Sequence, residues 1–180
     1  MLIRRSVLAL ALLTVAASAQ PAPAFYAGYD WDAEAALVED LLSRMTVEEK
    51  LGQLTQYTGQ WAVTGPAVTQ GGEDVIRAGG VGSFLNVYGA EATRRAQEVA
   101  VEESRLGIPL IIGYDVVHGF RTVFPVPLAE TASWNLDAAE LAARVAAREA
   151  AAAGIHWTFA PMVDIARDGR WGRIVEGAGE

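Results

Sequence analysis

Short apolar segments alternate with helical segments along this chain, and this alternation limits the possible folds more than any other feature. The apolar segments are residues 81–85, 110–114 and 155–160. Residues 110–114, LIIGY, show no apolar–polar alternation, which is typical of a strand covered on both faces. Strands separated by helices predict parallel β/α units and therefore an α/β fold. Three strands cannot close a barrel of eight, so the pattern fits either an open α/β sheet or part of a barrel.

Two helices are predicted in the first third of the chain, one from the spacing of apolar residues and one from a capping box. Residues 32–45 place apolar side chains at every fourth position, which predicts a first helix. Thr46 and Glu49 have the spacing of a capping box. This spacing predicts a second, short helix, with Leu51 and Leu54 facing the core.

Two further helices are predicted later in the chain. Residues 89–106 form one of them. Asp137 and Glu140 have the spacing of a second capping box, and the helix that they open continues to Ala153, where Gly154 closes it. A stripe of charged residues spaced by four predicts a solvated face on this helix: Glu140, Arg144 and Arg148.

The first 19 residues have the organisation of a secretory signal peptide. Arg4 and Arg5 form a positive start, residues 7–17 are almost wholly apolar, and small residues at 17–19 predict cleavage before Gln20. The alternative is a membrane anchor, but the apolar run is shorter than the roughly 20 residues that span a bilayer. We therefore predict an exported protein, periplasmic or extracellular, without a stable membrane span after cleavage. Residues 20–29 are predicted to be a loose lead-in.

The composition argues against several classes of function. A formal net charge of −8 argues against nucleic acid as a partner. Because the chain has no cysteine, it has no disulfide, no thiolate nucleophile and no cysteine-based metal site. The two histidines, His118 and His156, are far apart in the sequence and lack the spacing of metal ligands. We therefore expect no metal.

Polar residues follow the predicted strands at the ends where parallel sheets place functional groups. These residues are Asn86, Asp115 and Asp164. The carboxylate of an aspartate directly after a buried strand needs a hydrogen-bond or charge partner. Asp115 is therefore either a loop cap or salt-bridge partner, or an acceptor of hydrogen bonds from a ligand. His118 is either a hydrogen-bonded structural histidine or a general base.

Residues 160–173 combine three arginines, two aspartates and a tryptophan in one loop. A sugar site needs that mixture, because carboxylates and guanidinium groups bind hydroxyls through charge-assisted hydrogen bonds, and an aromatic face covers the apolar face of the ring. The alternative is a network of arginines and aspartates that only fixes a long loop. Glu176 and Glu180 follow among glycines, and they are either the acid/base pair of a glycosidase or part of a solvated loop.

Six sequence blocks stand out for their order and spacing. They are MTVEEKLGQL at 45–54, YDVVHG at 114–119, TVFPVPL at 122–128, APMVD at 160–164, RWGR at 170–173 and EGAGE at 176–180. Together these blocks resemble glycoside hydrolase family three, and the resemblance extends from about residue 30 to the last residue of the chain.

The resemblance implies both a fold and a function. Residues 30–180 would be the incomplete N-terminal part of a barrel domain, the first three or so β/α units of a (β/α)8 TIM-type barrel. Members of the family are retaining exo-acting hydrolases, so the implied function is hydrolysis of terminal non-reducing β-D-glucosyl or related β-glycosyl residues. The implied substrate is a β-linked oligosaccharide or an aryl or alkyl β-glycoside. No cofactor is implied, because retaining glycoside hydrolysis needs only carboxylates and water.

Carried over position by position, the resemblance assigns substrate binding to two residues. Asp115 matches the aspartate that holds hydroxyls of the terminal sugar, and Arg173 matches the arginine that grips the same sugar. Four further residues are expected to shape the loops near the site without being catalytic: His118, Asp164, Arg170 and Trp171.

In this family a Lys-His pair that touches the sugar, the aspartate nucleophile and the acid/base glutamate come after the position of Glu180. No catalytic residue is therefore expected within the chain, and the isolated chain is expected to be inactive. Two alternatives stay open, a noncatalytic carbohydrate-binding or inactive truncated fragment and the β-N-acetylglucosaminidase branch of the same family. That branch carries an acidic-Gly-Gly motif after the second strand, where this sequence has VVHG at 116–119.

Overall fold

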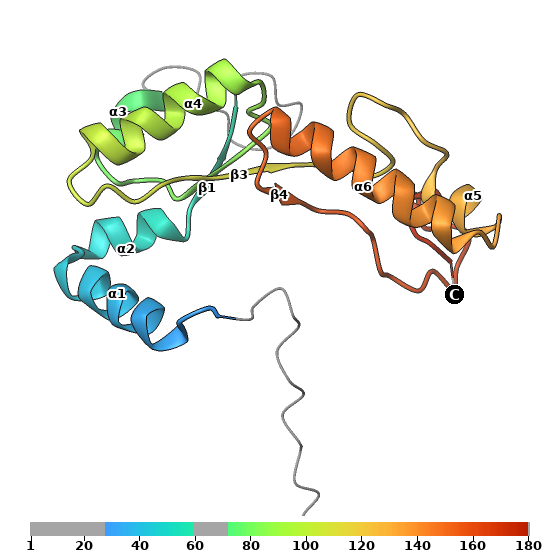
Figure 1. The fold of residues 1–180 in the computed structure, drawn as a ribbon, viewed down its shortest axis with the longest axis horizontal. Helices are drawn as coiled ribbons and strands as arrows, with labels where there is room; N and C mark the ends of the chain where they lie inside the picture. Colours follow the sequence, from blue (N-terminus) through green and yellow to red (C-terminus); the bar gives the residue numbers. More distant parts are fainter. Residues whose placement is uncertain (1–27, 60–71, 180) are drawn as a thin grey trace, which may run out of the picture. The chain divides into compact units, whose positions relative to one another are not determined.

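The structure, a computed structural model, describes residues 28–59 and 72–179 (Figure 1). The predicted signal peptide and most of the predicted lead-in lie outside these residues. The chain divides into two compact units, residues 1–38 and 39–180. Helix α1 (Trp31–Arg44) confirms the first predicted helix, and none of its residues is buried. Within the described ranges no helix is both long and apolar enough to cross a membrane.

Four parallel strands form one sheet in the larger unit, which confirms the predicted α/β fold. The order in the sheet is β1-β2-β3-β4, the same as the order in the chain. Phe84 is the register partner of Tyr57 on one side and of Ile112 on the other. The strands are β1 (Gln56–Thr58), β2 (Ser83–Leu85), β3 (Ile111–Tyr114) and β4 (Trp157–Thr158). Strand β1 was not predicted, and β4 is shorter than the predicted residues 155–160.

Helices or helical turns precede, connect and follow the strands. They are α2 (Val47–Gln53), α3 (Gly72–Arg77), α4 (Ala90–Glu98), the π-helical continuation η2 (Val99–Glu103), α5 (Pro127–Thr131), α6 (Leu136–Ala152) and the short η3 (Ile174–Glu176). The predicted helix 89–106 corresponds to α4 with η2, whereas α3 and α5 were not predicted.

The predicted capping box at Asp137 is wrong. Asn135 caps α6 by accepting a hydrogen bond from the backbone nitrogen of Ala138 at 3.0 Å. Asp137 lies within the first turn, where a carboxylate interacts favourably with the helix dipole. The N-cap of this helix is therefore two residues earlier than the sequence pattern indicated.

Two apolar clusters hold the helices against the sheet. The first joins α3 and η2 to β2 and β3 through Ile76, Val81, Phe84, Val99, Ala100, Leu110 and Ile112. The second lies under α6 and contains Val116, Ala146, Ala150, Ala153 and Ile155. Ile112 is fully buried, and a side chain of this size stabilises a fold by roughly 1.5–3 kcal/mol when it leaves water.

One face of β3 is covered and the other is open within the part of the chain that the structure describes. Ile112 is fully buried, while its neighbour Ile111, which points to the opposite face, is 50% exposed. Trp157 and Phe159 are also exposed. The expectation that residues 110–114 are covered on both faces is therefore not met among these residues.

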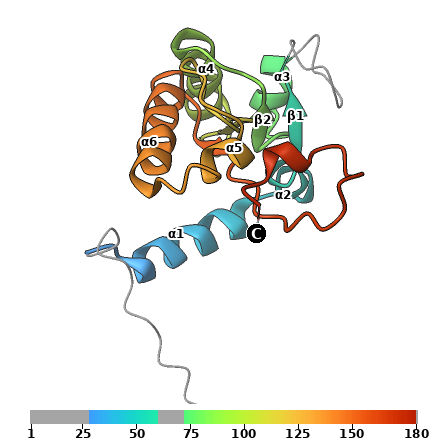
Figure 2. The same ribbon diagram turned by 90° about the vertical axis from the view of Figure 1, so that its right-hand side faces the viewer.

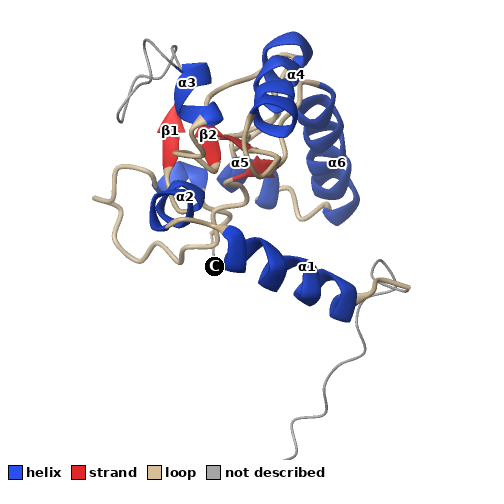
Figure 3. Cartoon of the chain, turned by 90° about the vertical axis from the view of Figure 1, so that its left-hand side faces the viewer, coloured by secondary structure: helices blue, strands red, loops and turns tan. Residues whose placement is uncertain are grey.

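The C-terminal end of α6 lies next to the N-terminal end of α4, as the ribbon shows in Figure 1 and in the two opposite side views of Figure 2 and Figure 3. The contact is close because Gly154, with φ +83°, ends α6 directly against Thr93 of α4. A Cβ atom at position 154 would lie 2.0 Å from the hydroxyl oxygen of Thr93. The backbone nitrogen of Gly89 also donates to the carbonyl of Ala153 at 2.9 Å. The end of one helix and the start of the other are thus fixed together.

Helix α2 packs through its backbone, and the expected inward orientation of Leu51 and Leu54 is wrong. Leu54 is 86% exposed, and the buried residues of the helix are Glu49 and Gly52. A Cβ atom at Gly52 would lie 1.9 Å from the carbonyl oxygen of Gly79. The absence of a side chain at this position therefore decides which face of α2 turns inward.

Glu49 combines a helix cap with a long-range ion pair. The predicted capping box is confirmed, since Glu49 accepts a hydrogen bond from the nitrogen of Thr46 at 2.8 Å and the Thr46 hydroxyl accepts one from the nitrogen of Glu49 at 3.2 Å. Arg105 donates to both carboxylate oxygens, at 2.9 and 2.5 Å, and to the carbonyl of Arg44 at 2.8 Å. These bonds, with Arg105 contributing most, lower the pKa of the Glu49 carboxyl from 4.5 to about 2.

Glu49 should make the stability of the protein sensitive to acid. Because its pKa is lower in the folded protein than in the unfolded chain, the ionised carboxyl stabilises the fold fully above about pH 4.5, and this contribution is lost as the pH falls towards about 2. We expect Glu49→Gln to lower the urea midpoint of unfolding at pH 7. The difference from the unsubstituted protein should shrink steadily between about pH 5 and about pH 2.

Glu48→Gln is the matched control, since Glu48 lies on the same helix and is exposed. It should leave the urea midpoint nearly unchanged across this pH range. An effect of Glu49→Gln that is equally large at neutral pH and at the acid end of the range would show that the ionised carboxyl is not responsible.

Candidate functional site

The carboxyl ends of β2, β3 and β4 meet at one edge of the sheet, because neighbouring parallel strands point the same way. Asn86 follows β2 and donates its backbone nitrogen to the carbonyl of Gly113 at 3.0 Å. Asp115 follows β3 directly and is exposed. The loop after β4 carries Asp164 a few residues beyond the end of that strand. The sequence therefore placed all three polar residues at the correct edge.

The loop after β3 folds back on itself as a tight hairpin, residues 118–124. The nitrogen of Phe124 donates to the carbonyl of His118 at 2.8 Å, and Gly119 forms an antiparallel bridge with Val123. Gly119 has φ +107°, and a Cβ atom there would lie 1.9 Å from the carbonyl oxygen of Thr122. Only glycine fits this turn.

His118 is held within this hairpin. Its Nδ1 lies 2.9 Å from the carbonyl oxygen of Phe124. Because a carbonyl only accepts, Nδ1 carries a hydrogen and donates it to this oxygen. The arrangement favours the structural interpretation of His118.

Arg170 and Trp171 lie in the exposed loop between β4 and η3. Arg170 donates through Nε to both oxygens of Asp168, at 2.9 and 3.0 Å, and its side chain is 90% exposed. Asp168 also accepts from the backbone nitrogen of Arg170 at 3.0 Å. Trp171 is exposed, and its nitrogen donates to the carbonyl of Asp168 at 3.1 Å. These contacts brace the turn locally.

Arg173 forms a two-point ion pair with Glu176. Its Nε donates to one carboxylate oxygen at 2.8 Å and its Nη2 to the other at 2.5 Å. The Glu176 carboxylate raises the pKa of Arg173, and the carboxylates of Asp115 and Asp164 add to this effect. Arg173 in turn lowers the pKa of Glu176, and His118 contributes to the same change.

The groups that change the pKa of Arg173 or of Glu176 form a cluster around this ion pair, since charges influence a pKa only at short range. The cluster joins one residue after β3, one in the hairpin and three from the long loop: Asp115, His118, Asp164, Arg173 and Glu176. Neither the Asp115 nor the Asp164 side chain accepts a hydrogen bond from the described residues. Two carboxylates beside a fixed guanidinium group can bind neutral polyols such as sugars.

Glu176 has a role that the sequence left undecided. Its lowered pKa keeps the carboxyl ionised at neutral pH, whereas a general acid needs a raised pKa. It is therefore a partner for Arg173, a role that the spacing of three residues along the chain could have indicated. Glu180 lies outside the described residues. Nowhere in residues 28–59 and 72–179 do three or more acidic or histidine side chains gather in a group that could hold a metal ion.

Comparisons with known proteins agree on one family. A family profile described as Glycosyl hydrolase family 3 N terminal domain matches residues 46–180. The periplasmic beta-glucosidase of Salmonella typhimurium is 46% identical over 150 residues, which are 83% of this chain and 19% of that protein.

Solved structures point to the same family. The beta-glucosidase of Listeria innocua in complex with isofagomine matches with a TM-score of 0.69 and 40% identity, over 81% of this chain and 20% of that one. A mutant of the Listeria enzyme in complex with laminaribiose matches with a TM-score of 0.67 and 37% identity, over 81% of this chain and 21% of that one. The chain thus spans about a fifth of the length of these relatives.

The pairing in the cluster can be tested by titration. In Arg173→Met the carboxyl pKa of Glu176 should rise towards its usual value of 4.5, because its main hydrogen-bond donor is lost. The measurement is the carboxyl carbon shift of Glu176 followed by NMR against pH. Arg170→Met is the control and should leave that titration unchanged, since Arg170 pairs with Asp168. Equal shifts in both variants would refute the specific pair.

Proposed function

This chain belongs to glycosyl hydrolase family 3, and we therefore propose that the complete protein hydrolyses terminal non-reducing β-D-glucosyl or related β-glycosyl residues by a retaining mechanism. The cluster around Arg173 carries the proposal, because it sets a guanidinium group beside two carboxylates that accept no hydrogen bond from the described residues. The substrate is a β-linked oligosaccharide or an aryl or alkyl β-glycoside. The names of the relatives support this substrate class.

We propose that residues 30–180 form the first part of a (β/α)8 barrel. Two features support this fold. The strands are ordered in the sheet as in the chain, whereas a doubly wound sheet reverses its strand order. The open face of the sheet carries Ile111, Trp157 and Phe159, side chains of the kind that fill the interior of such a barrel.

Two residues of the cluster are proposed to contact the sugar, and the others are proposed to hold these residues or the loops in place. Asp115 accepts hydrogen bonds from hydroxyls of the terminal sugar, and Arg173 donates to them while Glu176 holds its orientation. The loops are shaped by His118, Asp164, Arg170 and Trp171.

The catalytic pair is proposed to lie outside residues 1–180. A retaining mechanism needs two carboxylates roughly 5 Å apart on either side of the scissile bond, one as nucleophile and one as acid/base. Glu176 is committed to Arg173 and fits neither role. No cofactor is required by this chemistry.

We also propose that the protein is exported. Residues 1–19 act as a signal peptide, residues 20–29 form a lead-in, and the protein acts in the periplasm or outside the cell. The periplasmic beta-glucosidase among the relatives supports this location.

Asp115→Asn in the complete protein should lower kcat/KM for an aryl β-D-glucoside by about a hundredfold or more. A hydrogen bond to a charged group contributes about 1.5–3 kcal/mol, and a carboxylate can accept from more than one sugar hydroxyl. Asp137→Asn is the control, because Asp137 lies in the first turn of α6 and takes no part in the cluster. It should leave kcat/KM within about twofold.

The outcomes separate the parts of the proposal. Near-normal kinetics of Asp115→Asn would remove this residue from the sugar site. A complete protein that binds β-glucosides without hydrolysing them would support the noncatalytic alternative. Turnover by the isolated chain of residues 1–180 would show that the catalytic pair lies within it.

A further inference from the structure

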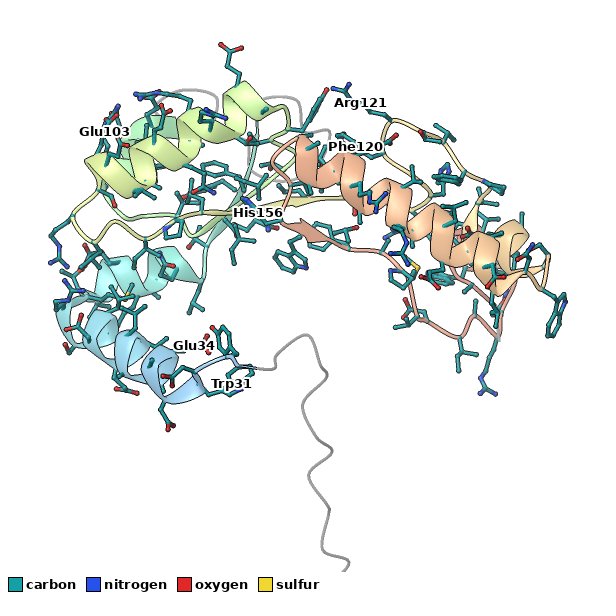
Figure 4. The ribbon with its side chains drawn as sticks, viewed as in Figure 1. Trp31, Glu34, Glu103, Phe120, Arg121 and His156 are labelled. Carbon is teal, nitrogen blue, oxygen red and sulfur yellow. The ribbon has the colours of Figure 1, made fainter. Side chains whose placement is uncertain are left out.

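The loop that carries Arg173 ends against helix α5. The hydroxyl of Thr131, the last residue of α5, donates to the carbonyl oxygen of Ala178 at 2.7 Å. Gly179 follows, and a Cβ atom there would lie 3.5 Å from the side chain of Leu128 on the same helix. Helix α5 also contacts η3, and in Figure 4 the last residues of the chain pass beside this helix. A hydrogen bond and close packing thus join two segments that are 47 residues apart in the chain.

The hydroxyl of Thr131 has a single hydrogen and three carbonyl oxygens within reach. The oxygens of Pro127 and Leu128, at 3.1 and 3.2 Å, belong to its own helix, and that of Ala178 is the nearest. The carbonyl of Leu128 already accepts from the backbone nitrogen of Ala132 at 3.2 Å. The carbonyl of Ala178 accepts no other hydrogen bond from the described residues. Thr131 is therefore the side chain that pairs with this carbonyl.

A second contact holds the same segment from the side of β4. Gly177 forms a parallel bridge with Met162, in the loop that follows β4. The nitrogen of Gly177 donates to the carbonyl of Ile174 at 3.4 Å. The nitrogen of Glu176 donates to the carbonyl of Arg173 at 3.0 Å, which closes the turn η3. The end of the loop is therefore held on one side by α5 and on the other by the loop after β4.

The anchored segment leads directly into the ion pair. Between Glu176 and Ala178 the chain contains only Gly177. The carboxylate of Glu176 accepts from Nε and Nη2 of Arg173, at 2.8 and 2.5 Å. Every link from Thr131 to the guanidinium group is thus a covalent bond or a hydrogen bond. A shift of Ala178 would move Glu176 and turn the plane of the guanidinium group.

We propose that Thr131 is a positioning residue for the sugar site, whose hydroxyl fixes the end of the loop and, through Glu176, the orientation of Arg173. The kinetic consequence rests on the proposed function, whereas the tether itself does not. Within the described chain the hydroxyl of Thr131 donates to neither Asp115 nor Arg173. We therefore expect Thr131 to change the affinity for the sugar and not the chemical step.

The main experiment compares Thr131→Val with Thr131→Ser in the complete protein. Valine has nearly the shape of threonine but no hydroxyl, whereas serine keeps the hydroxyl. For an aryl β-D-glucoside, Thr131→Val should raise KM about fivefold and change kcat by less than about twofold, because a loosened arginine binds the sugar less well in the ground and transition states alike. In Thr131→Ser, KM should stay within about twofold of its original value. An unchanged KM in Thr131→Val, or an equal rise in both variants, would overturn the proposal.

Thr55→Val is the matched control. The hydroxyl of Thr55 donates to the carbonyl of Leu51, four residues earlier, at 2.8 Å. It makes no other hydrogen bond among the described residues, so its removal leaves the loop around Arg173 untouched. Thr55→Val should change neither constant. A rise in KM as large as that of Thr131→Val would show that the loss of a hydroxyl acts through general stability, and the proposal would fail.

A double-mutant cycle separates positioning from general stability. If Thr131 acts through the ion pair, the effects of Thr131→Val and Glu176→Gln on KM will be non-additive, because the tether has little left to position once the pair is weakened. A residue that only stabilises the fold gives additive effects. Additivity in this cycle would refute the proposal.

Two readouts do not depend on activity. Without substrate, the amide of Glu176, which closes η3, should exchange hydrogen faster in Thr131→Val than in Thr131→Ser. The carboxyl pKa of Glu176 should rise towards 4.5 in Thr131→Val only, because its hydrogen bonds from Arg173 loosen. If the complete protein hydrolyses no β-glycoside, the proposed function fails while these readouts still decide whether Thr131 fixes the ion pair. Faster exchange with an unchanged Glu176 titration would limit Thr131 to holding the end of the loop, and the positioning role would be wrong.

Discussion

Each strand of the sheet pairs with the strand that precedes it in the chain, and the arrangement of the polar groups depends on this parallel pairing. A parallel neighbour can be reached only by a crossover connection, which here contains helices. All strand ends then point to one edge, and the loops that leave it must share the space there. Asp115 and the loop around Arg173 are close because β3 and β4 are neighbours, although α5 and α6 separate the two in the chain.

The charged groups of this edge are arranged by pairing. An arginine side chain has five N–H groups, and Glu176 accepts from two of those of Arg173. The pair sets the plane of the guanidinium group, so its remaining N–H groups have a defined direction. An arginine without such a partner would have to be ordered by the ligand itself, at a cost in affinity.

The sequence predicted those features that depend on residues close together in the chain. Apolar runs indicated β2, β3 and β4, and the spacing of Thr46 and Glu49 indicated the start of α2. Strand β1 was not predicted because Gln56–Thr58 is short and not apolar, and α5 was not predicted because it has only five residues. The pairing of Glu49 with Arg105, 56 residues away, and the contact of Glu149 with the hairpin depend on tertiary packing, which no local pattern records.

The agreement between strand order and chain order also bears on how the protein is made. Each strand can pair with one that has already left the ribosome, so the sheet can grow in the direction of synthesis without waiting for a distant segment. Long-range contacts such as that of Glu149 with Thr122 can form only after α6 has emerged. The hairpin of residues 118–124 would therefore be fixed only after α6 has been synthesised, although the hairpin itself leaves the ribosome earlier.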